Sequence, residues 1–408
     1  MRHDDRTLDN CIKCSDCNTA CPVMKAYPAF PGPKVLGPDT ERFRKEGVAS
    51  DTRWVEYCTG CHGCDVACPH GVHVSELIAK AKAQHTKTGI RAVRDHWLAR
   101  PAFLGTLCSG TTPFSNAIMG LKPNRWLMSS MADITAERPF PAYSSKPLTE
   151  ADGNVNRGQK VVFFPGCFIR YNNPEVGRIV VELLRRNGFS VEVATASCCG
   201  MPSMANGDKA ELMRCVEKNV KEMEPAVARG VPIVTACTSC SYALKGDYAH
   251  LPEGSSGFAA SARKLSSNTY DLAELLTGLL NAGKLNVDFR ATPLKLAYHA
   301  PCHLKSQGIG RPWLRLLRAV PGIEIEEIKA DCCGMAGTFG FKSEKYPISM
   351  DIGQELFDGI AAYKPEFVVT ECGSCQMQIA HGTGLKTRHP AEILLEAYQN
   401  GTSTRVAV

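Results

Sequence analysis

Short apolar runs alternate with amphipathic stretches over much of the chain, most regularly after residue 158. Each run is four to six residues long and rich in β-branched or aromatic side chains, which is typical of buried strands. The runs lie at 160–164, 191–195, 231–235, 294–298, 323–328 and 367–370. Helical periodicity separates them, for example at 177–186 and 312–320. The alternation predicts an α/β fold whose parallel sheets are covered on both faces.

The strand pattern occurs twice, and the same cysteines accompany both copies. Each copy has a single cysteine, then a Cys-Cys-Gly triplet, then a C-x2-C pair, and matching cysteines are 134 or 135 residues apart. Such regular self-similarity indicates a duplication, which predicts one lobe at 159–283 and a second at 284–408. The cysteines are Cys167, Cys198, Cys199, Cys237 and Cys240 in the first lobe, and Cys302, Cys332, Cys333, Cys372 and Cys375 in the second.

These cysteines follow predicted strands, so the five of each lobe are expected at the carboxyl edge of its sheet. Five thiolates exceed the need of a tetrahedral zinc or of an ordinary cubane cluster. Adjacent cysteines can bridge, or serve different irons of a larger cluster. The alternative is a buried structural pair with zinc at the C-x2-C motif. Gly200 and Gly334, which follow the paired cysteines, are expected to let the backbone approach the cluster.

The N-terminal part contains two near-identical cysteine runs, which begin at Cys11 and Cys58. Each is C-x2-C-x2-C-x3-C-P, the spacing by which bacterial ferredoxins hold two cubane 4Fe-4S clusters, with the fourth cysteine on the other cluster. Zinc sites need no third C-x2-C step, and disulfides need an oxidising compartment. We predict a small α-helical ferredoxin-like domain at 1–88, with Cys11, Cys14, Cys17 and Cys68 at one cluster and Cys58, Cys61, Cys64 and Cys21 at the other.

A basic segment follows this domain. Between residues 80 and 125 basic side chains far outnumber the single acid, so this stretch accounts for the whole net charge of +6. Residues 101–121 carry no charge. A basic amphipathic helix beside an uncharged stretch favours contact of the segment 89–158 with an anionic membrane surface or with a partner protein, and a solvated linker is the alternative. The apolar face of the helix comprises Ile90, Val93, Trp97 and Leu98.

Length and composition narrow the class of protein. The 408 residues suffice for two or three domains, and twenty cysteines are too few for a disulfide scaffold. The polar segment 1–6 has no apolar leader, so reduced thiols in the cytoplasm are expected. The chain has no basic stripe of the kind that indicates nucleic-acid binding.

No G-x-G-x-x-G motif follows a predicted strand, so a partner must supply the flavin or nicotinamide. Cys215 is expected in the core, and Cys108 has no assigned role.

Four histidines lie near the cysteine motifs. His299 and His303 flank Cys302 and could hydrogen-bond a cluster sulfur or relay protons. A surface or core position is the alternative for both. His62 and His70 lie in the ferredoxin-like loops, where we expect them to be exposed.

Together, the two sets of cysteines resemble proteins that fuse the C and B subunits of heterodisulfide reductase. A narrower resemblance rests on a Pro-Gly-Pro-Lys…Gly-Pro-Asp loop at 31–44, on His-Ala-Pro-Cys-His at 299–303 and on the Cys-Cys-Gly stretch at 332–342. These stretches are similar to the C-subunit family of anaerobic glycerol-3-phosphate dehydrogenases, and the similarity covers nearly the whole chain. The ferredoxin and Cys-Cys-Gly motifs are shared with relatives in glycolate and lactate oxidation.

The narrower resemblance implies a non-catalytic electron-transfer subunit of anaerobic respiration. Its expected cofactors are two cubane 4Fe-4S clusters and one or two further iron–sulfur clusters in the lobes. Its expected partners are a flavoprotein dehydrogenase, which oxidises glycerol 3-phosphate, and membrane quinone. Its expected location is the cytoplasm, at the inner face of the cell membrane.

Two other activities stay open at the level of sequence. The first lobe has both Cys237 and Cys240, whereas some family members lack one of these cysteines. The resemblance to heterodisulfide reductase implies that a complete lobe holds a non-cubane 4Fe-4S cluster able to cleave a disulfide. The other alternative is the iron–sulfur subunit of a glycolate or lactate oxidation complex.

Overall fold

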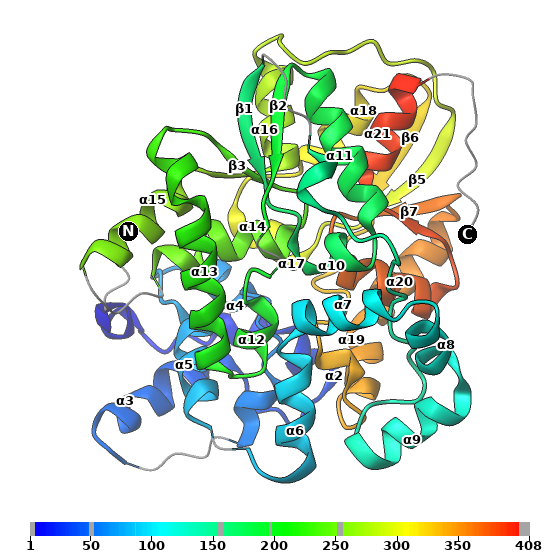
Figure 1. Cartoon of the computed structure of the whole chain (residues 1–408). Helices are drawn as coiled ribbons and strands as arrows, with labels where there is room; N and C mark the ends of the chain where they lie inside the picture. The colour runs from blue at the N-terminus through cyan, green and yellow to red at the C-terminus, as the bar shows by residue number, and fades with distance from the viewer. Residues whose placement is uncertain are drawn as a thin grey trace.

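The computed structural model describes residues 5–48, 53–85, 87–153, 158–195, 198–250 and 256–399. The start of the polar N-terminal segment, residues 1–4, lies outside them. Two lobes form the upper part of the molecule, a helical N-terminal domain lies below them at the lower left, and a helical arm extends from the lower centre to the lower right (Figure 1).

Each lobe is built on a four-stranded parallel sheet, so the predicted α/β fold is confirmed. The orders β2-β1-β3-β4 and β6-β5-β7-β8 are the same arrangement repeated. The edge strands β4 and β8 were not predicted, because they are short and mostly polar. The strands are β1 (Gln159–Phe163), β2 (Phe189–Val193), β3 (Ile233–Thr235), β4 (Thr269–Asp271), β5 (Leu294–Tyr298), β6 (Ile323–Glu327), β7 (Phe367–Val369) and β8 (Thr387–Arg388).

Helices cover both faces of the sheets, and the two lobes share one apolar core. Helix α11 packs on α21, and α16 packs on α18. The helices of lobe 1 are α10 (Gly166–Tyr171), α11 (Pro174–Arg186), α12 (Met201–Ala205), α13 (Lys209–Ala228), α14 (Thr238–Lys245), α15 (Ser256–Ser267) and α16 (Leu272–Asn281). Those of lobe 2 are α17 (Cys302–Gln307), α18 (Pro312–Arg318), α19 (Tyr346–Tyr363), α20 (Gly373–Thr383) and α21 (Pro390–Gln399).

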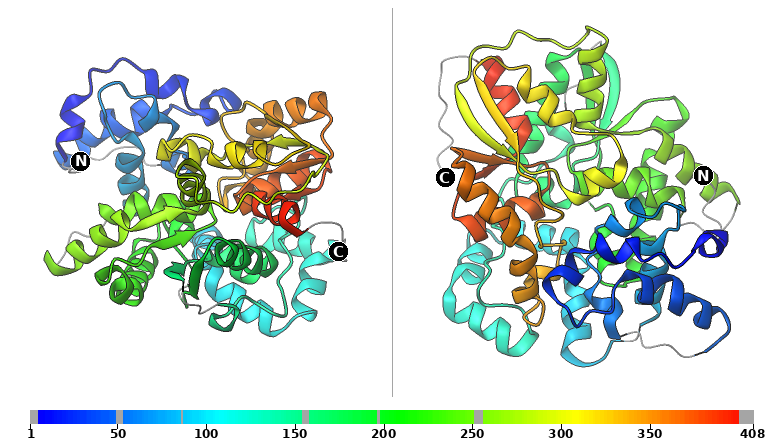
Figure 2. Two further views of the ribbon diagram at one scale, coloured as in Figure 1. Left: turned by 90° about the horizontal axis from the view of Figure 1, so that it is seen from above. Right: turned by 180° about the vertical axis from the view of Figure 1, so that it is seen from behind.

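The N-terminal domain is helical in the part that the structure describes, as the ferredoxin-like pattern predicts. Its core continues into lobe 2, because Phe339, Ile348 and Ile352 pack with its apolar side chains. Helix α2 lies against α19, which places the domain beside lobe 2 (Figure 2). The α-helices are α1 (Asp16–Thr19), α2 (Pro22–Ala26), α3 (Thr40–Lys45), α4 (Gly63–Val66) and α5 (Val74–Gln84).

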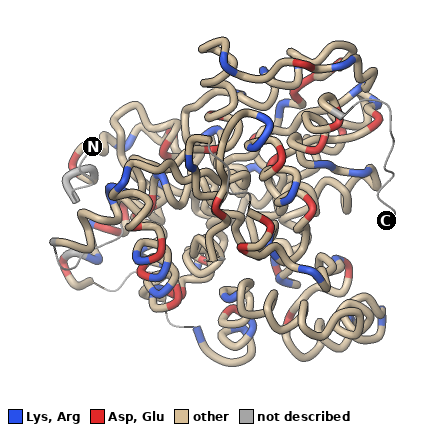
Figure 3. Tube along the Cα trace, turned by 45° about the horizontal axis from the view of Figure 1, so that its top comes forward, with Lys and Arg blue, Asp and Glu red and all other residues tan. Residues whose placement is uncertain are grey.

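The arm consists of α6 (Gly89–Leu98), α7 (Pro101–Gly110), α8 (Phe114–Gly120) and α9 (Lys122–Ala132). On its first helix, three of the four residues of the predicted apolar face point outward, namely Ile90, Val93 and Trp97, and the fourth, Leu98, is buried. Val93 is 52% exposed, whereas Arg94 and Asp95 on the other side are each 3% exposed. Along α7 and α8 the arm carries no charge, so it is almost wholly tan in Figure 3. Within the described ranges, no helix is long and apolar enough to cross a bilayer.

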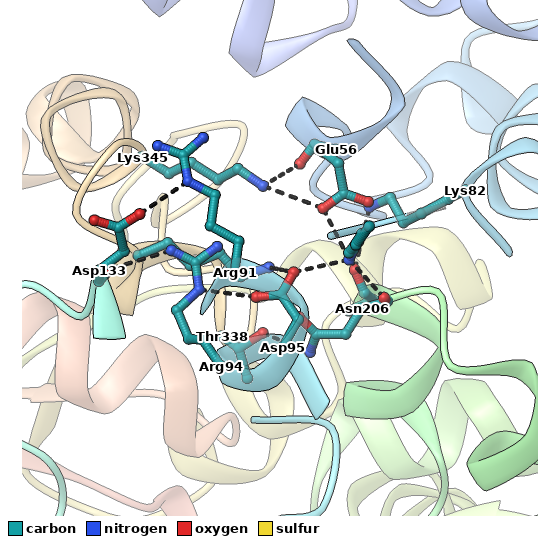
Figure 4. Close-up of polar contacts among 12 residues, drawn as sticks. Glu56, Lys82, Arg91, Arg94, Asp95, Asp133, Asn206, Thr338 and Lys345 are labelled. Carbon is teal, nitrogen blue, oxygen red and sulfur yellow. Dashed lines mark hydrogen bonds and ion pairs between the residues drawn. The ribbon is translucent and has the colours of Figure 1, made fainter. Parts of the chain in front are cut away.

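The basic side chains of α6 are paired with acids of the same chain, so this helix is not a solvated basic linker. Arg94 donates to Glu344 at 2.8 Å, and Asp95 accepts from Lys342 at 2.9 Å and from Lys87 at 2.8 Å. The contacts with Glu344 and Lys342 tie α6 to lobe 2. Figure 4 shows Arg94 and Asp95 within the surrounding polar network, which also includes Glu56 and Lys345. The sequence pattern showed the amphipathic helix, but it did not show that acids distant in sequence neutralise its charge.

Candidate metal centres

The first ferredoxin-like cavity is lined by three cysteines of the first run and one of the second, together with Lys13, Ser15 and His70. Burial and then the neighbouring thiols raise the pKa of Cys17 to about 11. Lys13 and Ser15 have positive φ angles, which turn the backbone sharply so that the thiols converge. The cysteines of this cavity are Cys11, Cys14, Cys17 and Cys68.

A second cavity is lined by three cysteines of the second run and one of the first. Gly60 and His62 have the positive φ angles that Lys13 and Ser15 have in the first run. Burial, followed by the thiol of Cys332 in lobe 2, raises the pKa of Cys61. This site therefore lies next to a thiol of lobe 2. Its cysteines are Cys21, Cys58, Cys61 and Cys64.

The loop of the second run is held by both lobes. His303 of lobe 2 contacts the carbonyl oxygen of Gly60 at 3.0 Å, and Ser306 donates to that of Cys61 at 3.2 Å. Tyr242 of lobe 1 hydrogen-bonds Nδ1 of His62 at 2.9 Å. The expectation that His62 is exposed was therefore wrong: it is 6% exposed and lies under Tyr242. A contact with a residue so distant in sequence leaves no local signal. His70 is exposed, as expected.

The carboxyl edges of the two sheets and the second cysteine run enclose a cavity of about 150 Å³. Nine of the ten repeated cysteines line it, and the tenth, Cys198, is also buried. Cys58 and Cys61 form part of its wall, so the second ferredoxin-like site opens on the same space. The sequence placed five thiols at each sheet edge, but it could not show that the two edges face each other.

Thiols within each lobe hydrogen-bond one another and perturb one another's acidity. In lobe 1, the Cys198 and Cys240 thiols lower the pKa of Cys199 to about 5. In lobe 2, the Cys375 thiol lowers the pKa of Cys372 to about 6. The thiolate is the form of cysteine that binds metals. Clusters of soft, water-shielded sulfur donors with no carboxylate among them suit iron or zinc.

The two Cys-Cys-Gly turns have the same geometry. The N–H groups of Gly200 and Gly334 donate to Cys198 and Cys332 respectively, each at 3.4 Å. Both glycines have φ near +90°. A Cβ at Gly334 would also lie 2.0 Å from the carbonyl oxygen of Ser349. Glycine is required at position 334 because the backbone there lies against helix α19. We had expected glycine to be required because the backbone approaches the cluster.

The remaining candidate residues lie close to these sites. Cys215 is buried as expected, but its thiol interacts with Cys198, so lobe 1 has a sixth thiol that sequence reasoning did not include. Cys108 lies on α7, part of the arm. His303 has partners on both ring nitrogens, Gly60 and Ser239. Burial lowers the pKa of His299 to about 3.

Comparison with known families identifies the parts of the chain. The family described as "Cysteine-rich domain" matches residues 161–245 and 296–380, and the "4Fe-4S dicluster domain" family matches residues 7–72. Both families indicate iron–sulfur clusters. The matches fall inside the segments predicted at 1–88, 159–283 and 284–408, whose boundaries stay predictions.

Curated relatives cover most of the chain. The C subunit of the anaerobic glycerol-3-phosphate dehydrogenase of Escherichia coli K12 is 35% identical over 97% of this chain and 99% of its own length. The B subunit of the fumarate reductase (CoM/CoB) of Methanothermobacter marburgensis is 26% identical over 97% of this chain and 74% of its own length. The lactate utilization protein A of Geobacillus thermodenitrificans is 31% identical over 58% of this chain and 98% of its own length.

Proposed function

The chain belongs to the C-subunit family of anaerobic glycerol-3-phosphate dehydrogenases, and from this premise we propose that it carries electrons from a flavoprotein partner to membrane quinone. The observation that supports the proposal is continuity: the second ferredoxin-like site shares the wall of the central cavity. Bound 4Fe-4S clusters supply one-electron transfer. The polypeptide holds their ligands, excludes water and fixes the spacing between sites.

We assign the ligands by cavity. The first site takes Cys11, Cys14, Cys17 and Cys68, and the second takes Cys58, Cys61, Cys64 and Cys21. Each lobe supplies its five repeated cysteines to a further iron–sulfur centre. Cys61 and Cys332 are neighbours, so electrons that reach the second site pass next to lobe 2.

The arm supports a peripheral membrane contact through apolar rather than basic residues. Trp97 and Trp126 are 46% and 68% exposed, and indole rings favour the membrane interface. Helices that lie in the interface bury such a face among the headgroups. The apolar arm surface comprises Ile90, Val93, Trp97, Phe103, Leu107, Phe114, Ile118, Leu121, Trp126, Leu127 and Met131.

Anaerobic co-purification with the flavoprotein partner tests the proposal. The complex should reduce a quinone analogue when glycerol 3-phosphate is added, and Cys61→Ser should abolish this activity. Cys108→Ser, which changes a thiol on the arm, should leave it unchanged. A complex that holds its full iron content but reduces no quinone analogue would contradict the proposal. Activity with lactate or glycolate in place of glycerol 3-phosphate would assign a different flavoprotein.

A second candidate function is disulfide reduction in the central cavity. Four thiols of lobe 1 and five of lobe 2 face this one space, which favours a substrate held between them. A new paramagnetic signal should then appear when a disulfide is added to the oxidised protein, and Cys333→Ala should abolish it. An unchanged spectrum rejects this activity.

A further inference from the structure

The two lobes differ at one position beside their thiols. Phe164 follows β1 in lobe 1, and His299 follows β5 in lobe 2. The N–H of Phe164 donates to the carbonyl oxygen of Val234 at 2.8 Å, and that of His299 donates to Val369 at 3.1 Å. Each residue precedes the single cysteine of its lobe by three positions. They are therefore structural equivalents, one aromatic hydrocarbon and one imidazole.

The surroundings explain why a phenyl ring is buried in lobe 1, but they do not explain why an imidazole is buried in lobe 2. Phe164 is fully buried in the apolar core of lobe 1, where a phenyl ring belongs. His299 is 1% exposed, yet neither of its ring nitrogens has a hydrogen-bond partner among the described residues. Buried polar atoms nearly always have a partner. The described part of the polypeptide supplies none for this imidazole, which indicates a partner of another kind.

The neighbouring thiols show where that partner lies. One ligand atom each from His299, Cys333 and Cys375 lies within 4.8 Å of the other two, and all three side chains are buried. Two donors on one metal, with bonds of about 2.0–2.3 Å, are themselves about 3.5–4 Å apart. The upper limit of 4.8 Å is slightly wider than this, so small side-chain movements suffice to bring the three atoms onto one ion. The imidazole of His299 forms no hydrogen bond with either of these two thiols, so the ring is not simply a donor to sulfur.

We propose that His299 is a nitrogen ligand of the metal centre in lobe 2, beside Cys333 and Cys375, whereas the centre in lobe 1 has sulfur ligands only. The inference rests on the proposed iron–sulfur function of the lobes. It makes the two centres chemically different: lobe 2 has a mixed nitrogen and sulfur site. In lobe 1, Phe164 has no donor atom, and the extra group near the thiols is the sulfur of Cys215.

Pulsed electron paramagnetic resonance on the full-length protein, labelled with 15N-histidine and purified anaerobically, tests the assignment. A strongly coupled histidine nitrogen should appear on one lobe signal and disappear in His299→Phe. Phe164→Leu, the matched change in lobe 1, should keep it. A wild-type spectrum with no strongly coupled histidine nitrogen would overturn the proposal, and this result needs no variant.

Two further controls distinguish the possible causes of a lost coupling. His303 is the other histidine in the His-Ala-Pro-Cys-His motif, so loss of the coupling in His303→Gln but not in His299→Phe would overturn the assignment. The signals of the two ferredoxin-like sites report whether each variant is folded. About eight irons per chain would contradict iron–sulfur lobes altogether, whereas about twelve or more irons without a coupled nitrogen would contradict only the role of His299.

Discussion

Lobe 1 and lobe 2 have the same sheet, the same thiols and different neighbours. In lobe 2, Ser306 on α17 donates to the carbonyl oxygen of Cys61, so α17 meets the second ferredoxin-like run. In lobe 1 the equivalent Tyr171 on α10 hydrogen-bonds Thr106 on α7, so α10 meets the arm. The duplicated backbone fixes the thiol positions, and the residues around it decide what each lobe touches. At this equivalent position, lobe 2 contacts the second ferredoxin-like run and lobe 1 contacts helix α7 of the arm.

The largest effect is expected where the ferredoxin-like sites meet lobe 2. Cys21→Ser should remove the signal of the second site and spare the first, because Cys21 lines the second cavity. Electron delivery to the quinone analogue should stop. Cys68→Ser is the matched change and should remove the first site instead. Spectra in which Cys21→Ser alters only the first site would reverse the ligand assignment.

The anchors of α6 and α7 to the two lobes offer a second comparison. Arg94 pairs with Glu344 of lobe 2 with its side chain 1% exposed, whereas Arg100 pairs with Asp208 of lobe 1 and is 19% exposed. Arg94→Met should lower the free energy of unfolding by about 3–5 kcal/mol, because it leaves buried charge unpaired. Arg100→Met should lower it by about 1 kcal/mol or less. If denaturant titrations gave the same loss of unfolding free energy for Arg94→Met and Arg100→Met, the anchor to lobe 2 would be no stronger than the anchor to lobe 1.

The apolar arm surface should bind lipid vesicles. Burial of one large apolar side chain is worth about 1.5–3 kcal/mol, so Trp97→Ala with Trp126→Ala should weaken vesicle binding by at least about tenfold. Tyr270→Ala, which alters a 36% exposed aromatic side chain of lobe 1 outside the arm, is the control. Flotation assays that show equal binding for both variants would remove the membrane role of the arm.

Acid should loosen the contact with lobe 2. Burial raises the pKa of Glu56, but Lys82, Lys345 and Lys87 outweigh it and lower the pKa to about 2 from an ordinary 4.5. The unfolded chain therefore takes up this proton first as pH falls, so the stability from Glu56 is present above pH 4.5 and lost between pH 4.5 and 2. Glu56→Gln should flatten this part of the unfolding profile. If the free energy of unfolding of Glu56→Gln fell as steeply with pH between 4.5 and 2 as that of the wild type, other acids would be responsible for the acid sensitivity.

The sequence predicted the backbone better than the interfaces. The first three strands of each lobe were recognisable by their β-branched runs, and the duplicated cysteines by their spacing. The polar edge strands Thr269–Asp271 and Thr387–Arg388 lack such a run. The outward apolar face of α6 and the burial of His62 depend on partners more than a hundred residues away, such as Glu344 and Tyr242, which no local pattern reveals.

The central claim is that the second ferredoxin-like site, whose loop both lobes hold, interacts most closely with the thiols of lobe 2, where Cys332 lies next to Cys61. Magnetic coupling between reduced clusters tests it directly, because the coupling weakens steeply with distance. Cys333→Ala in lobe 2 and Cys199→Ala in lobe 1 are changes at equivalent positions. We predict that the splitting of the second site's resonance signal disappears in Cys333→Ala and survives in Cys199→Ala. Loss of the splitting in Cys199→Ala, with its survival in Cys333→Ala, would contradict the account.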